Sequence, residues 1–117
     1  MEKHVKVVVI GGGVVGCSIL FHLAKFGLKD CILLERNELT SGSSWHAAGS
    51  VHAISSDPNI SKLMAYTIKL YKEIEETSGH SVGFKPSGGF YLASNEVWYD
   101  YLKRERSKAR YMGLDQE

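Results

Sequence analysis

The sequence predicts an α/β fold, with a βαβ unit at its N-terminal end. A β-branched run, VKVVVI, occupies residues 5–10, and the glycine-rich sequence GGGVVG follows it directly. Apolar residues then recur at helical spacing until a second apolar run, CILLE, at residues 31–35. A strand, a tight turn, a helix and a strand in so short a span form a βαβ unit with a parallel sheet and a right-handed crossover.

Each element of this unit has a local signal. The first strand, residues 5–10, is apolar nearly throughout, the pattern of a parallel strand covered on both faces. The helix begins at Val14 and ends at Gly27, since glycine readily takes the left-handed conformation that closes helices. The second strand, residues 31–35, shows the same buried pattern. Two strands alone cannot bury both of their faces, so we expect an incomplete sheet and the N-terminal portion of a larger protein.

Two more helices are predicted in the C-terminal half of the chain. The pair Asp57-Pro58 marks the start of the first, and Gly79 ends it. Asn95 caps the second, which runs to about Met112. A turn and a short strand, residues 90–93, are expected between them.

Composition and charge exclude several classes of function. The 117 residues amount to one domain at most, and 44% hydrophobic with 23% charged residues is ordinary for a globular protein. Lys plus Arg (14) nearly equals Asp plus Glu (13), so neither nucleic acid nor a membrane is expected as a partner. Cys17 and Cys31 have no metal-ligand spacing and are predicted to be small buried residues in a reducing compartment. No residue is an evident catalytic acid or base, and no metal site is indicated.

The glycine-rich turn predicts a dinucleotide site in a Rossmann-like domain. In Gly11-x-Gly13-x-x-Gly16, the first glycine permits the turn, the second lets the backbone approach a pyrophosphate, and the third lets helix and strand pack closely. The helix N-terminus offers N–H groups to the phosphates. Glu35 follows about 20 residues later, where a carboxylate accepts hydrogen bonds from the ribose hydroxyls. A carboxylate repels the 2′-phosphate of NADP, although Arg36 beside it leaves NADP open on this argument alone.

The loop after the second strand favours FAD over NAD. It reads LTSGSSWHAAG over residues 39–49, and places hydroxyls, an aromatic ring and an imidazole directly after the ribose-binding acid. A loop leaving that strand end runs along the dinucleotide toward its far half, where small residues allow close approach to a flat ring. The predicted cofactor-binding residues are Gly11, Gly13, Val14, Val15, Gly16, Glu35, Arg36, Ser43, Ser44, Trp45, His46 and Ala47.

This loop also resembles that of a known family. The sequences LLER and SGSSWHAAG, and later PSGGFYLA, resemble the N-terminus of the dimethylglycine and sarcosine dehydrogenases, members of the D-amino-acid-oxidase-like FAD-dependent oxidoreductases. The resemblance covers essentially the whole chain. It implies that His46 holds FAD covalently, through a ring nitrogen bonded to the 8α-methyl group of the flavin. Neutral imidazole is a suitable nucleophile for that bond. His52 is the alternative attachment residue.

The resemblance implies an enzyme that oxidises an N-methyl amine, dimethylglycine or sarcosine, by hydride transfer to flavin. Tetrahydrofolate in a C-terminal part and an electron-transferring flavoprotein are the implied further cofactor and partner. Three alternatives stay open: a related flavoprotein acting on another amine, a non-catalytic scaffold like the pyruvate dehydrogenase phosphatase regulatory subunit, and an inactive truncated fragment.

The expected organisation follows from these assignments. Residues 1–36 are the dinucleotide-binding unit, residues 37–56 a flavin-side loop, and residues 57–117 helices and a short strand leading toward a substrate domain. The apolar stretch at residues 7–21 contains four glycines and no cleavage motif, so it is predicted to be folded rather than a signal peptide or membrane span. Because the first strand begins close to Met1, we expect a cytoplasmic protein of bacterial type, or a mitochondrial-matrix protein if the organism is eukaryotic.

Overall fold

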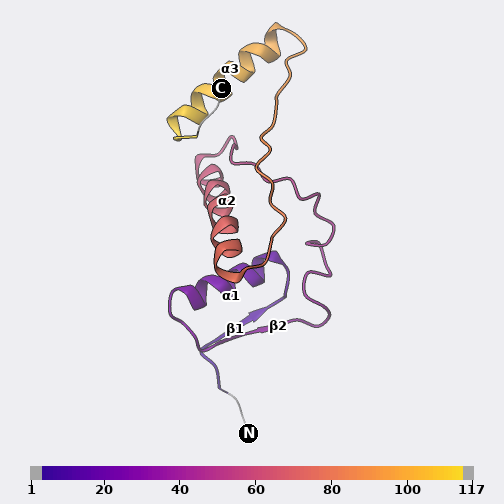
Figure 1. Ribbon diagram of the computed structural model, residues 1–117, viewed down its shortest axis with the longest axis vertical. Coiled ribbons are helices and arrows are strands. Elements are labelled where there is room, and N and C mark those ends of the chain that lie inside the picture. Colours follow the sequence, from indigo (N-terminus) through magenta and orange to yellow (C-terminus); the bar gives the residue numbers. More distant parts are fainter. Residues whose placement is uncertain (1–3, 115–117) are drawn as a thin grey trace. The chain divides into compact units, whose positions relative to one another are not determined.

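The computed structural model describes residues 4–114 and has an α/β architecture (Figure 1). The chain divides into two compact units, of which the first ends at Ser50 and the second begins at Val51. In chain order the elements are β1 (Val7–Ile10), α1 (Val14–Lys25), β2 (Cys31–Leu34), α2 (Pro58–Ser78) and α3 (Glu96–Tyr111).

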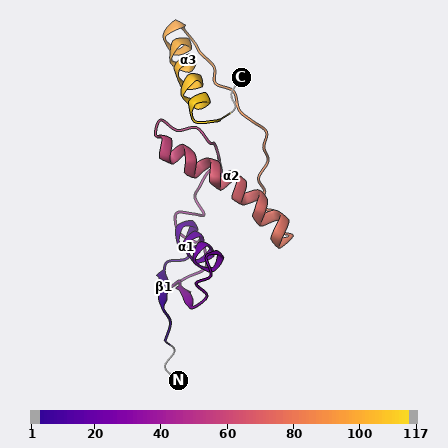
Figure 2. The same cartoon turned by 90° about the vertical axis from the view of Figure 1, so that its left-hand side faces the viewer.

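The first unit is the predicted βαβ unit. β1 and β2 pair in parallel, with Val7 opposite Cys31 and Ile10 opposite Leu34. α1 contacts both strands and lies beside β1 (Figure 2). The helix ends as predicted, since Gly27 takes a left-handed conformation with φ of 89° two residues after its last turn. The short turn between β1 and α1 places the start of α1 at the carboxyl end of β1.

Only one face of the two strands is covered within this unit. Val9 is buried under α1, whereas Val8 is 46% exposed and Ile10 is 85% exposed. The prediction that the first strand is covered on both faces is therefore wrong for residues 4–50. Successive side chains of a strand alternate between faces, and one helix covers one face only.

The two cysteines are partly buried rather than fully buried as predicted. The thiol of Cys17 donates to the carbonyl oxygen of Gly12 at 3.5 Å, and that of Cys31 to Leu28 at 3.1 Å. Both are free thiols that hydrogen-bond to backbone carbonyls, so they retain a small structural role.

The helices of the second unit begin and end where their caps predict. Asp57 caps α2, with its side chain accepting from two backbone N–H groups of the first turn, and Gly79 closes it in the left-handed conformation. Asn95 caps α3 by accepting from the N–H of Trp98 at 3.0 Å. No helix among the described residues has the length and apolar character needed to cross a membrane.

The strand predicted at residues 90–93 is not formed. Between α2 and α3 the chain runs without helix or strand (Figure 2), and Phe90 and Leu92 are 98% and 92% exposed. A strand needs a neighbouring strand to receive its backbone hydrogen bonds, and none pairs with this segment in the described part of the chain. The apolar and aromatic pattern alone therefore misled the prediction.

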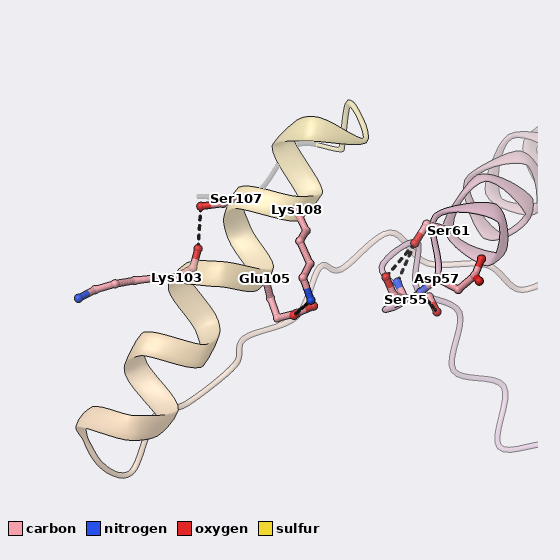
Figure 3. A network of polar contacts seen from close by, with 7 residues as sticks. All are labelled: Ser55, Asp57, Ser61, Lys103, Glu105, Ser107 and Lys108. Carbon is pink, nitrogen blue, oxygen red and sulfur yellow. Dashed lines mark hydrogen bonds and ion pairs between the residues drawn. The ribbon is translucent and has the colours of Figure 1, made fainter.

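A buried serine orders the entry to α2 (Figure 3). The hydroxyl of Ser61 is almost fully buried, accepts from the N–H of Ser55 at 2.8 Å and donates to the carbonyl oxygen of Ser55 at 3.2 Å. On α3, Lys108 pairs with Glu105 at 2.6 Å on the helix surface. These contacts fix local geometry at the two helices and lie outside the predicted cofactor site.

Candidate dinucleotide-binding site

The glycine-rich turn between β1 and α1 has the geometry that its three glycines predict. Gly11 has φ of 104°, a conformation that side chains disfavour. A Cβ on Gly16 would collide with the carbonyl oxygen of Gly11, and one on Gly13 would lie 3.3 Å from the hydroxyl oxygen of Ser44. The turn is therefore tight, and its backbone approaches both the helix and the following loop closely.

The first turn of α1 presents backbone N–H groups at the end of β1. Gly13 is the N-cap and supplies no side-chain cap. The N–H of Val14 donates to the hydroxyl of Ser44 at 2.9 Å. The N–H groups of Val15 and Gly16 have no protein acceptor among residues 4–114. Free amides and the partial positive charge of the helix end are the features that bind a pyrophosphate.

Glu35 follows β2 and hydrogen-bonds to the glycine turn. Its Oε2 accepts from the N–H of Gly12 at 2.6 Å, and its Oε1 accepts from the N–H of Asn37 at 2.9 Å. The bond from Gly12, then that from Asn37, lowers the pKa of this carboxyl below its usual value. Each carboxylate oxygen has two lone pairs, so Glu35 keeps capacity for ribose hydroxyls while it holds the turn.

The loop at residues 39–46 is attached to the same turn. The N–H of Thr40 donates to the carbonyl oxygen of Gly12 at 2.9 Å, and the N–H of Trp45 donates to the carbonyl oxygen of Thr40 at 3.0 Å. Thr40 has φ of 64°, the one positive φ among the described non-glycine residues. Successive turns close the loop on itself, so its position relative to the glycine turn is specified by the backbone.

Gly12 and Thr40 are site residues that the sequence analysis missed. A Cβ on Gly12 would lie 2.5 Å from Cδ2 of Leu39 and 3.1 Å from Cβ of Glu35, so a side chain here would displace the Leu39 side chain and press on Glu35. The place of Gly12 as the middle one of three consecutive glycines, Gly11-Gly12-Gly13, was an available signal. Thr40 offered none, because threonine is an unfavourable residue for a left-handed conformation.

His46 lies exposed on this loop, with one ring nitrogen engaged. Its Nδ1 is 3.1 Å from the carbonyl oxygen of Gly42. A carbonyl oxygen only accepts, so this contact assigns the proton to Nδ1 and leaves a lone pair on Nε2 of the neutral ring. Trp45 beside it is also largely exposed. The imidazole is thus held from one side and open on the other.

The other predicted residues lie around these groups. Arg36, Ser43 and Ala47 are exposed next to Glu35, Ser44 and His46, and they take no part in the hydrogen bonds between loop and turn that the structure describes. The structure therefore joins the glycines, the first-turn amides, Glu35 and Ser44 in one site. Among residues 4–114, no three His, Cys, Asp or Glu side chains cluster as metal ligands would.

These groups fit the adenosine and pyrophosphate half of a dinucleotide. The turn leaves no room for side chains where the backbone must approach phosphate, the amides are free, and the acid lies at the end of the second strand. The sequence also matches the model of the DAO family, the FAD-dependent oxidoreductases, over residues 6–117. The chain belongs to this family.

Membership of the FAD-dependent oxidoreductases decides between the dinucleotides in favour of FAD. The chain is 42% identical to the mitochondrial dimethylglycine dehydrogenase of Homo sapiens over 115 residues, which are 98% of this chain and 13% of that enzyme. It is 41% identical to human mitochondrial sarcosine dehydrogenase over 116 residues, again 98% and 13%. A 4-methylaminobutanoate oxidase of Paenarthrobacter nicotinovorans is 39% identical over 117 residues, 100% of this chain and 14% of that enzyme.

These relatives confirm the resemblance seen in the loop and beyond it. The chain spans only 13–14% of the length of the three relatives. Within that span, this chain contains the βαβ unit, the glycine turn, Glu35 and the loop with His46.

Proposed function

We propose that this chain is the FAD-binding segment of an oxidoreductase that oxidises N-methyl amines, dimethylglycine or sarcosine. The observation that supports it best is the joined site, in which Glu35 and the loop of His46 are both hydrogen-bonded to Gly12. The relatives named for such substrates match the chain over this site. Bound FAD supplies an acceptor for a hydride from the N-methyl carbon of the substrate.

The residues of this chain bind and orient the cofactor. The free amides of Val15 and Gly16 hold the pyrophosphate, and Glu35 accepts from the ribose hydroxyls. The exposed side chains Arg36, Ser43, Trp45 and Ala47 line the path toward the flavin. No step of the chemistry is assigned to an acid or base of this segment.

We also propose that His46 attaches the flavin covalently. With FAD bound, the lone pair of Nε2 would be the group that bonds to the 8α carbon of the flavin, as that carbon gives up a hydrogen and the imidazole its Nδ1 proton. The two electrons and two protons released would pass to the flavin, which dioxygen or the electron acceptor of the enzyme would reoxidise. The contact between Nδ1 and Gly42 supports this proposal, because it leaves Nε2 as the nucleophilic nitrogen.

The remaining assignments belong to the whole protein. Electrons leave to an electron-transferring flavoprotein, and tetrahydrofolate captures the one-carbon product in another part of the protein. We place the protein in the cytoplasm of a bacterium or, in a eukaryote, in the mitochondrial matrix. The relatives named above, two mitochondrial and one bacterial, support both locations.

Acid precipitation of the purified full-length protein tests the cofactor assignment. We expect flavin absorbance to stay with the precipitated wild type and to leave it in His46→Ala. His52→Ala is the matched control and retains the flavin, because His52 is an exposed histidine outside the site. If flavin stayed with precipitated His46→Ala and left precipitated His52→Ala, the attachment residue would be His52 and the assignment to His46 would be wrong.

Substrate titration separates an enzyme from a scaffold. Anaerobic addition of dimethylglycine or sarcosine bleaches the flavin absorbance of an amine dehydrogenase. Flavin that is retained but not bleached by any N-methyl amine would favour the non-catalytic scaffold. A protein that neither folds nor retains flavin would favour an inactive fragment.

A further inference from the structure

We propose that Ser44 is a positioning residue for flavin attachment: its hydroxyl ties the loop of His46 to the N-terminus of α1. This inference rests on the proposed attachment at His46. It assigns to Ser44 a task beyond contact with the cofactor, namely to hold the nucleophile at a fixed place relative to the pyrophosphate site.

The tie is a long-range hydrogen bond that replaces a missing cap. The N-cap of α1 is Gly13, which has no side chain, so the first N–H groups of the helix lack a local acceptor. The hydroxyl of Ser44, 30 residues further along the chain, accepts from the N–H of Val14 at 2.9 Å. The loop thus supplies the cap that the phosphate-binding turn cannot supply itself.

The position of the hydroxyl depends on the absence of a side chain at Gly13. A Cβ there would lie 3.3 Å from the hydroxyl oxygen of Ser44, tighter than ordinary van der Waals contact. The glycine that lets the backbone approach a pyrophosphate therefore also lets the loop approach the helix. Both contacts use the same open edge of the turn.

A hydroxyl suits this place because it donates and accepts at once. With the N–H of Val14 donating to it, Ser44 keeps its own O–H for a phosphate oxygen. One side chain then joins the helix, the loop and the cofactor. Alanine removes both contacts of the hydroxyl, whereas threonine retains the hydroxyl.

The tie determines where His46 lies. Ser44 and His46 are two residues apart, so their Cα atoms are separated by at most about 7 Å. The loop is attached to the turn at Thr40 through backbone and at Ser44 through its side chain, and the hydrogen bonds of His46 itself, to Gly42 and Ser43, stay within the loop. Without Ser44, the histidine end of the loop loses its attachment to α1.

Attachment is sensitive to such a loss because it needs the imidazole within near-attack distance of the 8α carbon. A misplacement of about 1 Å slows reactions of this kind by about 100-fold. Binding of the pyrophosphate to the amides of Val15 and Gly16 does not need the tie. Ser44→Ala should therefore slow attachment far more than it weakens FAD binding.

The test follows covalent incorporation into full-length apoprotein made under riboflavin limitation. After FAD is added, acid-stable flavin is measured over time, and the dissociation constant for FAD is measured at early times. We expect Ser44→Ala to bind FAD within a few-fold of wild type and to attach it about 10- to 100-fold more slowly. Ser44→Thr should recover most of the rate. Ser41→Ala, an exposed serine of the same loop outside the site, should attach FAD at the wild-type rate.

Several results would overturn the inference. Wild-type attachment in Ser44→Ala would show that the tie is unnecessary. Equal losses of FAD affinity and attachment would show that Ser44 acts only by binding phosphate, or that its loss causes a folding defect, and not that it positions His46. Failure of Ser44→Thr to recover the rate would show that the hydroxyl is not the active feature. If wild type itself holds no acid-stable flavin, the proposed attachment at His46 fails first, and that result is distinguishable from these.

Discussion

Replacement of Gly16 by alanine sets two physical effects against each other. Gly16 lies in the first turn of α1, where alanine is the better helix former by at most about 1 kcal/mol. The added Cβ, however, would collide with the carbonyl oxygen of Gly11 and lie 3.1 Å from the carbonyl carbon. No rotamer change relieves a collision with backbone, so the turn itself must move.

The collision decides whether Gly16→Ala stabilises or destabilises the βαβ unit. Overpacking costs about 1–3 kcal/mol, and the upper end applies because the neighbour is backbone in a turn with φ of 104° at Gly11. Subtracting about 1 kcal/mol for helix propensity leaves a net destabilisation of about 2 kcal/mol. That corresponds to about a 30-fold change in the equilibrium for opening the βαβ unit.

Hydrogen exchange by mass spectrometry on peptides from β1 and α1 measures this opening. We expect exchange about 30-fold faster in Gly16→Ala than in wild type. Gly89→Ala is the matched control, because its Cβ meets nothing within 4 Å and its φ lies outside the left-handed region. Slower exchange in Gly16→Ala would mean that helix propensity wins, and would refute the argument that this glycine exists for close packing.

Three further predictions concern charge, strain and capping. Because the pKa of Glu35 is lowered in the folded state, its ionised carboxylate stabilises the fold. This stabilisation is present above the usual pKa of 4.5 and is lost as pH falls through the lowered pKa of the folded protein. The unfolding temperatures of wild type and Glu35→Gln should converge below about pH 4.5. A difference in unfolding temperature that is unchanged at pH 3 would show that the bond from Gly12 to the ionised carboxylate does not cause it. Thr40→Gly relieves about 1–2 kcal/mol of left-handed strain and should unfold no earlier than wild type, whereas Ser41→Gly should unfold earlier; the reverse order would contradict the strain. Asp57→Ala should destabilise α2 by about 1 kcal/mol, seen as faster amide exchange in its first turn, while Asp57→Asn keeps most of the cap.

The sequence predicted what local chemistry determines. Gly27 and Gly79 end helices because their backbones reach the left-handed conformation, and Asp57 and Asn95 begin helices because their side chains accept from first-turn amides. These signals act within a few residues, so a single sequence suffices to find them.

The errors concern interactions that depend on the rest of the structure. Residues 90–93 have the composition of a strand, but pairing needs a partner that the described residues lack. The exposed Val8 and Ile10 show the same limit, since periodicity reports which side chains suit burial and not what covers them. Both errors arise where a local pattern meets a non-local requirement.

In the candidate site, one residue, Gly12, belongs to a local sequence motif and also makes non-local contacts. The glycine fingerprint treats position 12 as variable, yet Gly12 donates its N–H to Glu35, accepts from Thr40 and leaves space for Leu39. The first contact holds Glu35, the acid proposed to bind the ribose, and the second holds the loop of His46. A side chain at this position would press on both neighbours, because a Cβ would lie 3.1 Å from the Cβ of Glu35 and 2.5 Å from Cδ2 of Leu39. Glu35 and the loop of His46 are therefore coupled through one backbone position, and a motif that is compared residue by residue does not reveal that coupling.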